Sequence, residues 1–166
     1  MAITTAELQV LLSGGSTNTD PAASIGGAPS TTEVSSTPLH NIFDKITGGE
    51  SAAGDTEYRV LYVKNNNSTL DGENCKVYFG TNESSYISIG VSEAVDTNAA
   101  ALTDEETAPS GSITWTKPTT RSAAVTLGDL DSGSFRALYL RRVIPAGASA
   151  DDSVDFSLKV EIDTPA

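Results

Sequence analysis

The sequence predicts an all-β protein, an antiparallel β-sandwich of the immunoglobulin-like type, with a jelly roll as the second choice. From Asp55 onward apolar residues alternate with polar ones, which is the period of a strand with one buried face. Clusters of Gly, Pro, Asn, Asp and Ser separate about seven such runs, as turns do in a sandwich. A chain of 166 residues is long enough to bury one core, so we expect one structural unit.

The last predicted strand shows the alternation most clearly. Its apolar positions face one way and its polar positions face the other, the apolar ones being Val154, Phe156, Leu158, Val160 and Ile162. Weaker alternation predicts further strands at residues 75–79, 87–91, 113–116 and 123–127. Each of these strands should bury one face and leave the other in water.

Two other predicted strands, residues 58–64 and 135–144, carry apolar side chains on both faces. Such strands are typically central in a sheet, because both of their faces need cover. We expect their outer faces to be covered either by the N-terminal segment or by another subunit.

The first 54 residues differ in composition from the sandwich region, residues 55–166. A short strand is predicted at residues 7–12, and a stretch rich in Ser, Thr, Gly and Ala follows up to Pro38. Its sizeable apolar residues are Ile25 and Val34, too few for a core of its own. Because the stretch is also long for a loop, we expect an extended arm that is either mobile or ordered against a partner.

One short helix is predicted directly after this arm. Thr37 is a suitable cap, Pro38 suits the first helical position, and Gly48 can end the helix. The apolar residues between them recur at helical spacing: Leu39, Ile42, Phe43 and Ile46.

The chain is acidic, with 22 Asp and Glu against 10 Lys and Arg and a formal net charge of -12. Such a surface repels phosphate and anionic lipid, so we expect no nucleic-acid partner and no membrane partner. Residues 1–13 lack the basic and apolar regions of a signal peptide, and the chain has no run of roughly 18 apolar residues. The single cysteine, Cys75, alternates with Val77 and Phe79 and should be a small buried residue.

The residues that catalysis and metal binding need are sparse. The only histidine, His40, has no nucleophile or carboxylate motif around it. Residues 129–134 resemble the start of an EF-hand loop, but its glycine comes one residue early and Leu140 occupies the last ligand position. An irregular calcium site could use acidic turn residues, for which the weak candidates are Asp151, Asp152 and Asp155. We therefore expect no cofactor and no enzymatic activity.

Aromatic side chains leave a sugar-binding function open. Tyr78 and Tyr86 lie on the polar faces of their predicted strands, where a ring can stack on a glycan. Trp115 shares its face with Ile113 and is expected in the core.

Seven residues are candidates for contact with a partner. Arg141 and Arg142 are adjacent on a strand and must point to opposite faces, so an acid such as Asp155 or Glu161 should hold at least one of them near the core or an interface. A cross-strand salt bridge within the chain is one explanation, and an intersubunit anchor is the other. The remaining candidates are the apolar residues of the arm and the predicted helix: Ile25, Val34, Leu39, Ile42 and Phe43. The apolar stripe of the helix most simply packs inward on the sandwich, and binding to a neighbouring subunit is the alternative.

Several stretches resemble the small virion proteins of tailed bacteriophages. They are residues 12–27, 41–44, 53–59, 62–65 and 140–147, which together touch most of the chain in order. The resemblance implies a structural component of the capsid cement or decoration type, assembled in the host cytoplasm in many copies. It implies as partners the major capsid protein or other virion proteins, and further copies of the same chain.

We therefore expect a non-enzymatic virion protein that binds the exterior of a tailed-phage capsid and stabilises or decorates it. A neck, tail or baseplate component of the same fold is the first alternative. A glycan-binding or host-surface-binding module is the second.

Overall fold

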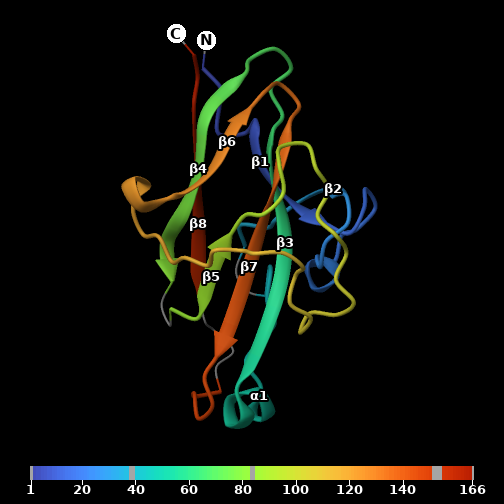
Figure 1. Ribbon diagram of the computed structural model, residues 1–166, viewed down its shortest axis with the longest axis vertical. Coiled ribbons are helices and arrows are strands. Elements are labelled where there is room, and N and C mark those ends of the chain that lie inside the picture. The colour runs from blue at the N-terminus through green and yellow to red at the C-terminus, as the bar shows by residue number, and fades with distance from the viewer. Residues whose placement is uncertain (1, 38–39, 83–84, 151–154, 166) are drawn as a thin grey trace.

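A computed structural model describes residues 2–37, 40–82, 85–150 and 155–165, and it confirms the predicted β-sandwich (Figure 1). Two antiparallel sheets pack against each other, one with the strand order β2-β1-β3-β7-β5 and one with the order β6-β4-β8. The strands are β1 (Leu8–Ser13), β2 (Pro29–Glu33), β3 (Asp55–Asn65), β4 (Gly72–Asn82), β5 (Ile87–Gly90), β6 (Val125–Leu130), β7 (Phe135–Ile144) and β8 (Phe156–Asp163). A six-residue helix, α1 (Gly48–Ala53), precedes β3, and short 3-10 turns lie at Pro21–Ala23 and Arg121–Ala123. In this described part of the chain, no helix has the length and apolar character needed to cross a membrane.

The two strands with apolar residues on both faces are the central pair, as predicted. β3 and β7 are paired along their length, from Asp55 opposite Ile144 to Lys64 opposite Phe135. Their inward side chains meet those of β4, β5 and β6 in the main core. Cys75 is fully buried there, which confirms its predicted place.

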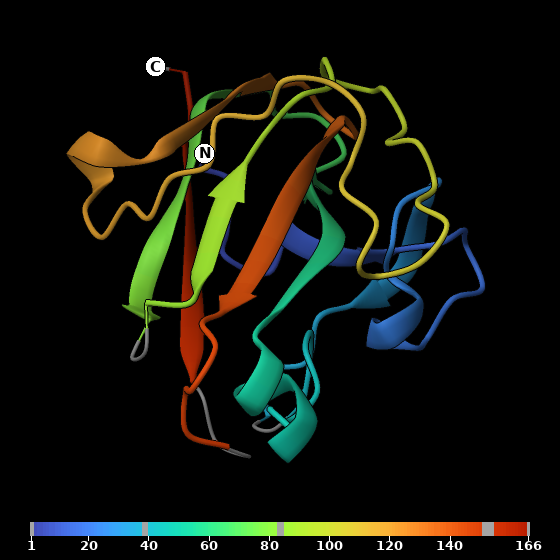
Figure 2. The ribbon, with the colours of Figure 1, turned by 60° about the horizontal axis from the view of Figure 1, so that its bottom comes forward.

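Segments of the same chain cover the outer face of β3 and β7. A second apolar cluster on this face contains Leu11, Val60, Tyr62, Ala99, Ala137 and Tyr139, with Ile113, Trp115 and Phe135 packed against it. The long segment between β5 and β6 supplies much of this cover, and in Figure 2 its yellow part lies beside the blue N-terminal segment. The backbone N–H of Gly27 donates to the carbonyl of Ala99, and the N–H of Ala99 donates to the Tyr62 hydroxyl at 2.7 Å. Another subunit is therefore not needed to cover this face.

The prediction of an extended arm is wrong for described residues 13–37. This stretch forms β2, which pairs with β1, and it continues along the sheet that contains β3. β1 pairs with residues 61–65 of β3, so residues 55–60 of β3 need other hydrogen-bond partners on that side. The carbonyls of Ser24 and Glu105 accept from the N–H groups of Val60 and Tyr58, both at 2.7 Å. A polar segment without a core of its own is thus ordered by backbone hydrogen bonds.

The helix predicted between Pro38 and Gly48 is also wrong. Ile42, Phe43 and Ile46 are buried as predicted, but they belong to a loop that is not helical. Leu39 lies outside the described residues. The helix begins only at Gly48, because Thr47 and Glu50 form a capping box in which each side chain accepts from the other's backbone N–H. The expected strand at residues 113–116 is likewise reduced to a single bridge between Thr116 and Ile89.

Candidate functional site

A cavity of about 450 Å³ opens between the two sheets near the α1 end of the molecule. Its walls come from β1, from residues 34–36, from the loop 40–45 and from the first half of β8. The interior is apolar, with Val10, Leu61, Ile87, Phe156 and Leu158 among its lining residues. Ser35, Ser36, Asn41, Lys45 and Asp155 give the cavity polar lining residues. The cavity thus combines an apolar floor with a lining that is about half polar or charged residues, and a concave site with both kinds of group can bind a partner.

Four of the seven predicted partner-contact residues line this one cavity: Val34, Ile42, Phe43 and Arg142. Val34 is half-buried, whereas Ile42 and Phe43 are each 7% exposed and also belong to the core. Two other candidates lie elsewhere. The carbonyl of Ile25 accepts from the N–H of Leu102, and the Arg141 guanidinium lies 4.7 Å from the Trp115 ring on the outer face. The seventh candidate, Leu39, is outside the described residues.

Two arginine side chains lie over the ring of Phe43, a lining residue of this cavity. The guanidinium carbons of Arg59 and Arg142 are 5.2 Å and 4.9 Å from the centre of its ring. Arginine stacks favourably on an aromatic face, most strongly when both are removed from water. Both arginines are almost fully buried, at 1% and 2% exposed. The ring therefore holds the loop 40–45 against β3 and β7.

Carboxylates neutralise both buried arginines. Arg142 forms ion pairs with Glu57, its cross-strand neighbour on β3, and with Asp44, whose oxygen lies 3.0 Å from the guanidinium. Arg59 pairs with Glu105 and donates from Nε to the carbonyl of Ile42 at 3.0 Å. The cross-strand explanation for Arg142 is thus confirmed, although its acids are Glu57 and Asp44 rather than Asp155 or Glu161.

Glu57, Arg59 and Asp44 are functional-site residues that the sequence did not predict. A signal for the first two existed, because residues at odd positions of β3 share the inward face with Leu61 and Val63. A charged side chain on such a face must find a partner, since an unpaired buried charge is costly. Asp44 gave no comparable signal, because it lies in a loop.

Burial raises the pKa of Glu57 above its ordinary value of 4.5, while the hydrogen bond and charge of Arg142 oppose that shift. Glu57 is 2% exposed, so desolvation of its carboxylate is the larger effect. The ion pair with Arg142 therefore offsets the desolvation cost of a charged Glu57 in the folded protein.

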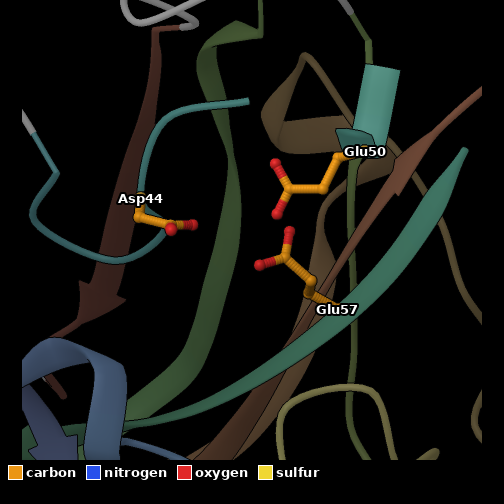
Figure 3. Close-up of side chains that lie close together, drawn as sticks. All are labelled: Asp44, Glu50 and Glu57. Atoms are coloured by element: carbon orange, nitrogen blue, oxygen red, sulfur yellow. The ribbon is translucent and has the colours of Figure 1, made fainter. Parts of the chain in front are cut away.

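Three carboxylates meet beside this network, as Figure 3 shows. Asp44 comes from the loop, Glu50 from α1 and Glu57 from β3, and one oxygen of each lies within 4.8 Å of the others. Each of these carboxylates already has a partner: Arg142 binds Asp44 and Glu57, and the Thr47 N–H donates to Glu50 at 2.6 Å. We assign no metal to them. Of the predicted calcium candidates, Asp155 is exposed beside the cavity, and Asp151 and Asp152 lie outside the described residues.

The aromatic candidates for sugar binding are mostly engaged. The Tyr78 hydroxyl donates to Glu161 at 2.5 Å, and Lys159 lies over the Tyr78 ring with Nζ at 5.9 Å from its centre. Tyr86 is half-buried. Trp115 packs on the second apolar cluster, so it belongs to the outer cover rather than to the main core. His40 is exposed and lines the cavity.

Comparison with known proteins finds no matching protein-family model, no matching curated protein and no matching solved structure.

Proposed function

We propose that this protein is a non-enzymatic structural protein of a tailed-bacteriophage virion, which binds the exterior of the capsid and stabilises or decorates it. The observation that carries the proposal is the open cavity between the sheets, where half-buried Val34 and exposed Lys45 lie beside the buried Ile42 and Phe43. Arg142 lines the same cavity, but Glu57 and Asp44 hold its guanidinium within the chain. The resemblance of residues 12–27 and 140–147 to phage virion proteins supplies the identity of the partner.

The physical role would be stabilisation by mass action. A protein that binds the assembled shell and not its free subunits shifts the equilibrium toward the shell. A sandwich with a paired charge network and an ordered N-terminal segment can act this way without large rearrangement, so little of the binding free energy is lost in ordering the chain. No cofactor is required for such a role.

A co-sedimentation experiment tests the proposal. Purified protein is added to phage particles that lack it, and the bound ratio to the major capsid protein is measured after pelleting. We expect saturable binding by the wild type. Val34→Glu places a charge beside the apolar cavity and should weaken attachment at least tenfold, which corresponds to about 1.4 kcal/mol. Lys45→Glu, on an exposed residue of the same cavity, should also weaken it.

Val143→Glu is the matched control, because Val143 is 39% exposed and is absent from the cavity wall. It should bind particles as the wild type does, with circular dichroism confirming that every variant is folded. Wild-type protein that stays in the supernatant, or cavity variants that bind normally, would contradict the proposal. Locating the bound protein on the particle by electron microscopy separates the capsid from the neck, tail or baseplate alternative.

A further inference from the structure

β8 is a long and regular strand with one hydrogen-bonded neighbour. It pairs with β4 over Phe156–Asp163, and no other described segment forms a backbone hydrogen bond with it. The strand contains neither Pro nor Gly, and both irregularities of its register with β4 arise from an extra residue in β4. Natural proteins usually protect such an edge with prolines, bulges or a covering segment, because a free edge can pair with another strand.

The inward side chains of β8 are only partly covered. Phe156, Leu158, Val160 and Ile162 are half-buried, whereas Val77 and Phe79 on the neighbouring β4 are at most 1% exposed. Hollows follow the strand along its length. The cavity described above lies along residues 155–158, and a second hollow of about 330 Å³ lies along residues 160–163, facing Ile3 and Leu8. An added strand would cover this row.

We propose that β8 pairs antiparallel with β8 of a second copy of the chain, with Val160 opposite Val160. This register places Leu158 opposite Ile162 on the inward face and Lys159 opposite Glu161 on the outward face. Lys159 is exposed, and the Glu161 side chain is 40% exposed although its carboxylate already accepts from Tyr78 and pairs with Arg121. A carboxylate can accept further hydrogen bonds beyond these two. By the two-fold symmetry the Lys159–Glu161 pair occurs twice, and opposite charges across strands are favourable.

Neighbouring registers each contain a like-charge pair. A shift of two residues in one direction places Lys159 opposite itself. A shift in the other direction places Glu161 opposite itself, although Lys159 then lies opposite Asp163. Like charges directly opposite each other are destabilising. A shift of one residue would oppose apolar and polar faces. Alternate residues of β8 point their N–H and C=O away from β4. In the proposed register each of these residues lies opposite one that does the same in the second copy, so the backbone groups can form hydrogen bonds.

The pairing would join the two three-stranded sheets into one six-stranded sheet, β6-β4-β8-β8-β4-β6. Apolar side chains of the second β8 would approach Val10 and Val34, which are half-buried on the opposite side of the cavity. The inference goes beyond the proposed function and does not depend on it, because it concerns the free protein in solution.

Charge reversal tests the register directly on the full-length chain by sedimentation equilibrium. The wild type should sediment as a dimer at micromolar concentration. Lys159→Glu and Glu161→Lys each place like charges opposite each other twice per dimer, so each should raise the dimer dissociation constant roughly tenfold. The double variant exchanges the two charges and should return the constant to near the wild-type value. A role of these residues inside the monomer would not produce that rescue.

Lys117→Glu is the matched control, because Lys117 is exposed on the segment before β6 and contacts Ser85 rather than β8. It should dimerise as the wild type does. A wild type that stays monomeric, single variants that dimerise normally, or a double variant that fails to recover would each overturn the proposal. Particle attachment is a separate measurement, so a failed dimer does not decide the proposed function.

Discussion

β7 and β8 are neighbours in sequence but have opposite environments. β7 is the central partner of β3, and its residues 137–140 are at most 1% exposed on either face. β8 is an edge strand whose apolar side chains are half-buried and whose polar side chains face solvent. The cleanest alternation in the sequence therefore belongs to the more exposed strand. A strand with apolar residues on both faces is the better indicator of the centre of a sheet, since both of its faces must be covered.

The same contrast applies to charge. Arg142 on β7 is buried and paired with Glu57 and Asp44. Arg121 lies over the outward face of β8, where Glu161 and Asp163 each lie 2.7 Å from its guanidinium, and all three side chains are 40–48% exposed. Each arginine has two acidic partners, so the count of ion pairs is equal. Their contributions should nevertheless differ several-fold, because burial changes the cost of losing a partner.

The largest effect is expected from Arg142→Ala. This change leaves Glu57 buried without its main partner, which should lower the free energy of unfolding by about 3–5 kcal/mol at pH 7. Urea denaturation at a fixed low protein concentration measures it. Arg141→Ala is the matched control: Arg141 is adjacent, half-exposed and stacked on Trp115, and its loss should cost about 1 kcal/mol or less.

The pH dependence of Arg142→Ala provides a second check. Without Arg142 the pKa of Glu57 should rise further, since the arginine opposes the effect of burial. The unfolded chain releases this proton near pH 4.5, while the folded chain keeps it to higher pH. Stability then falls as pH rises between the two values, so the variant should recover part of its loss when the pH is lowered from 7 toward 5. A loss of stability that is independent of pH would contradict this account of Glu57.

A matched pair of leucines compares the two strands at intermediate effect. Leu140 on β7 is fully buried, and Leu140→Ala should cost about 2–5 kcal/mol because it leaves a cavity in a packed core. Leu158 on β8 is half-buried beside an existing hollow, so Leu158→Ala should cost about 1 kcal/mol. Urea denaturation midpoints, compared at equal slope, give both values. Equal losses would mean that β8 is as well covered as β7.

Much of the fold followed from the sequence because strand periodicity reports burial directly. β1, β3, β5, β7 and β8 were located to within a few residues, and the central position of β3 and β7 followed from their mixed faces. β2 and the misplaced helix could not be predicted in this way. β2 is held by backbone hydrogen bonds that any sequence can form, and α1 is specified by the capping box of Thr47 and Glu50 rather than by apolar spacing.

The site was less predictable than the fold. Spacing identified Ile42 and Phe43 as inward-facing, although for a helix that does not exist. The sequence predicts an acidic partner for Arg141 or Arg142 but makes no such prediction for Arg59. The acids that pair with Arg59 and Arg142 depend on which loops return to the sheet. Asp44 and Glu105 reach the central strands from segments 98 and 46 residues away from their arginines, and no local pattern encodes such contacts.

Arg121→Ala should give the smallest effect and completes the comparison of the two arginines. Its partners Glu161 and Asp163 remain solvated when the guanidinium is removed, so neither is left as a buried charge. The loss should be at most about 1 kcal/mol and should shrink further in 1 M NaCl, where exposed charges are screened over about 3 Å. The loss of stability in Arg142→Ala should persist in the same salt, because the Glu57 carboxylate that loses its partner is buried. Equal salt dependence of the two variants would mean that burial does not separate these ion pairs.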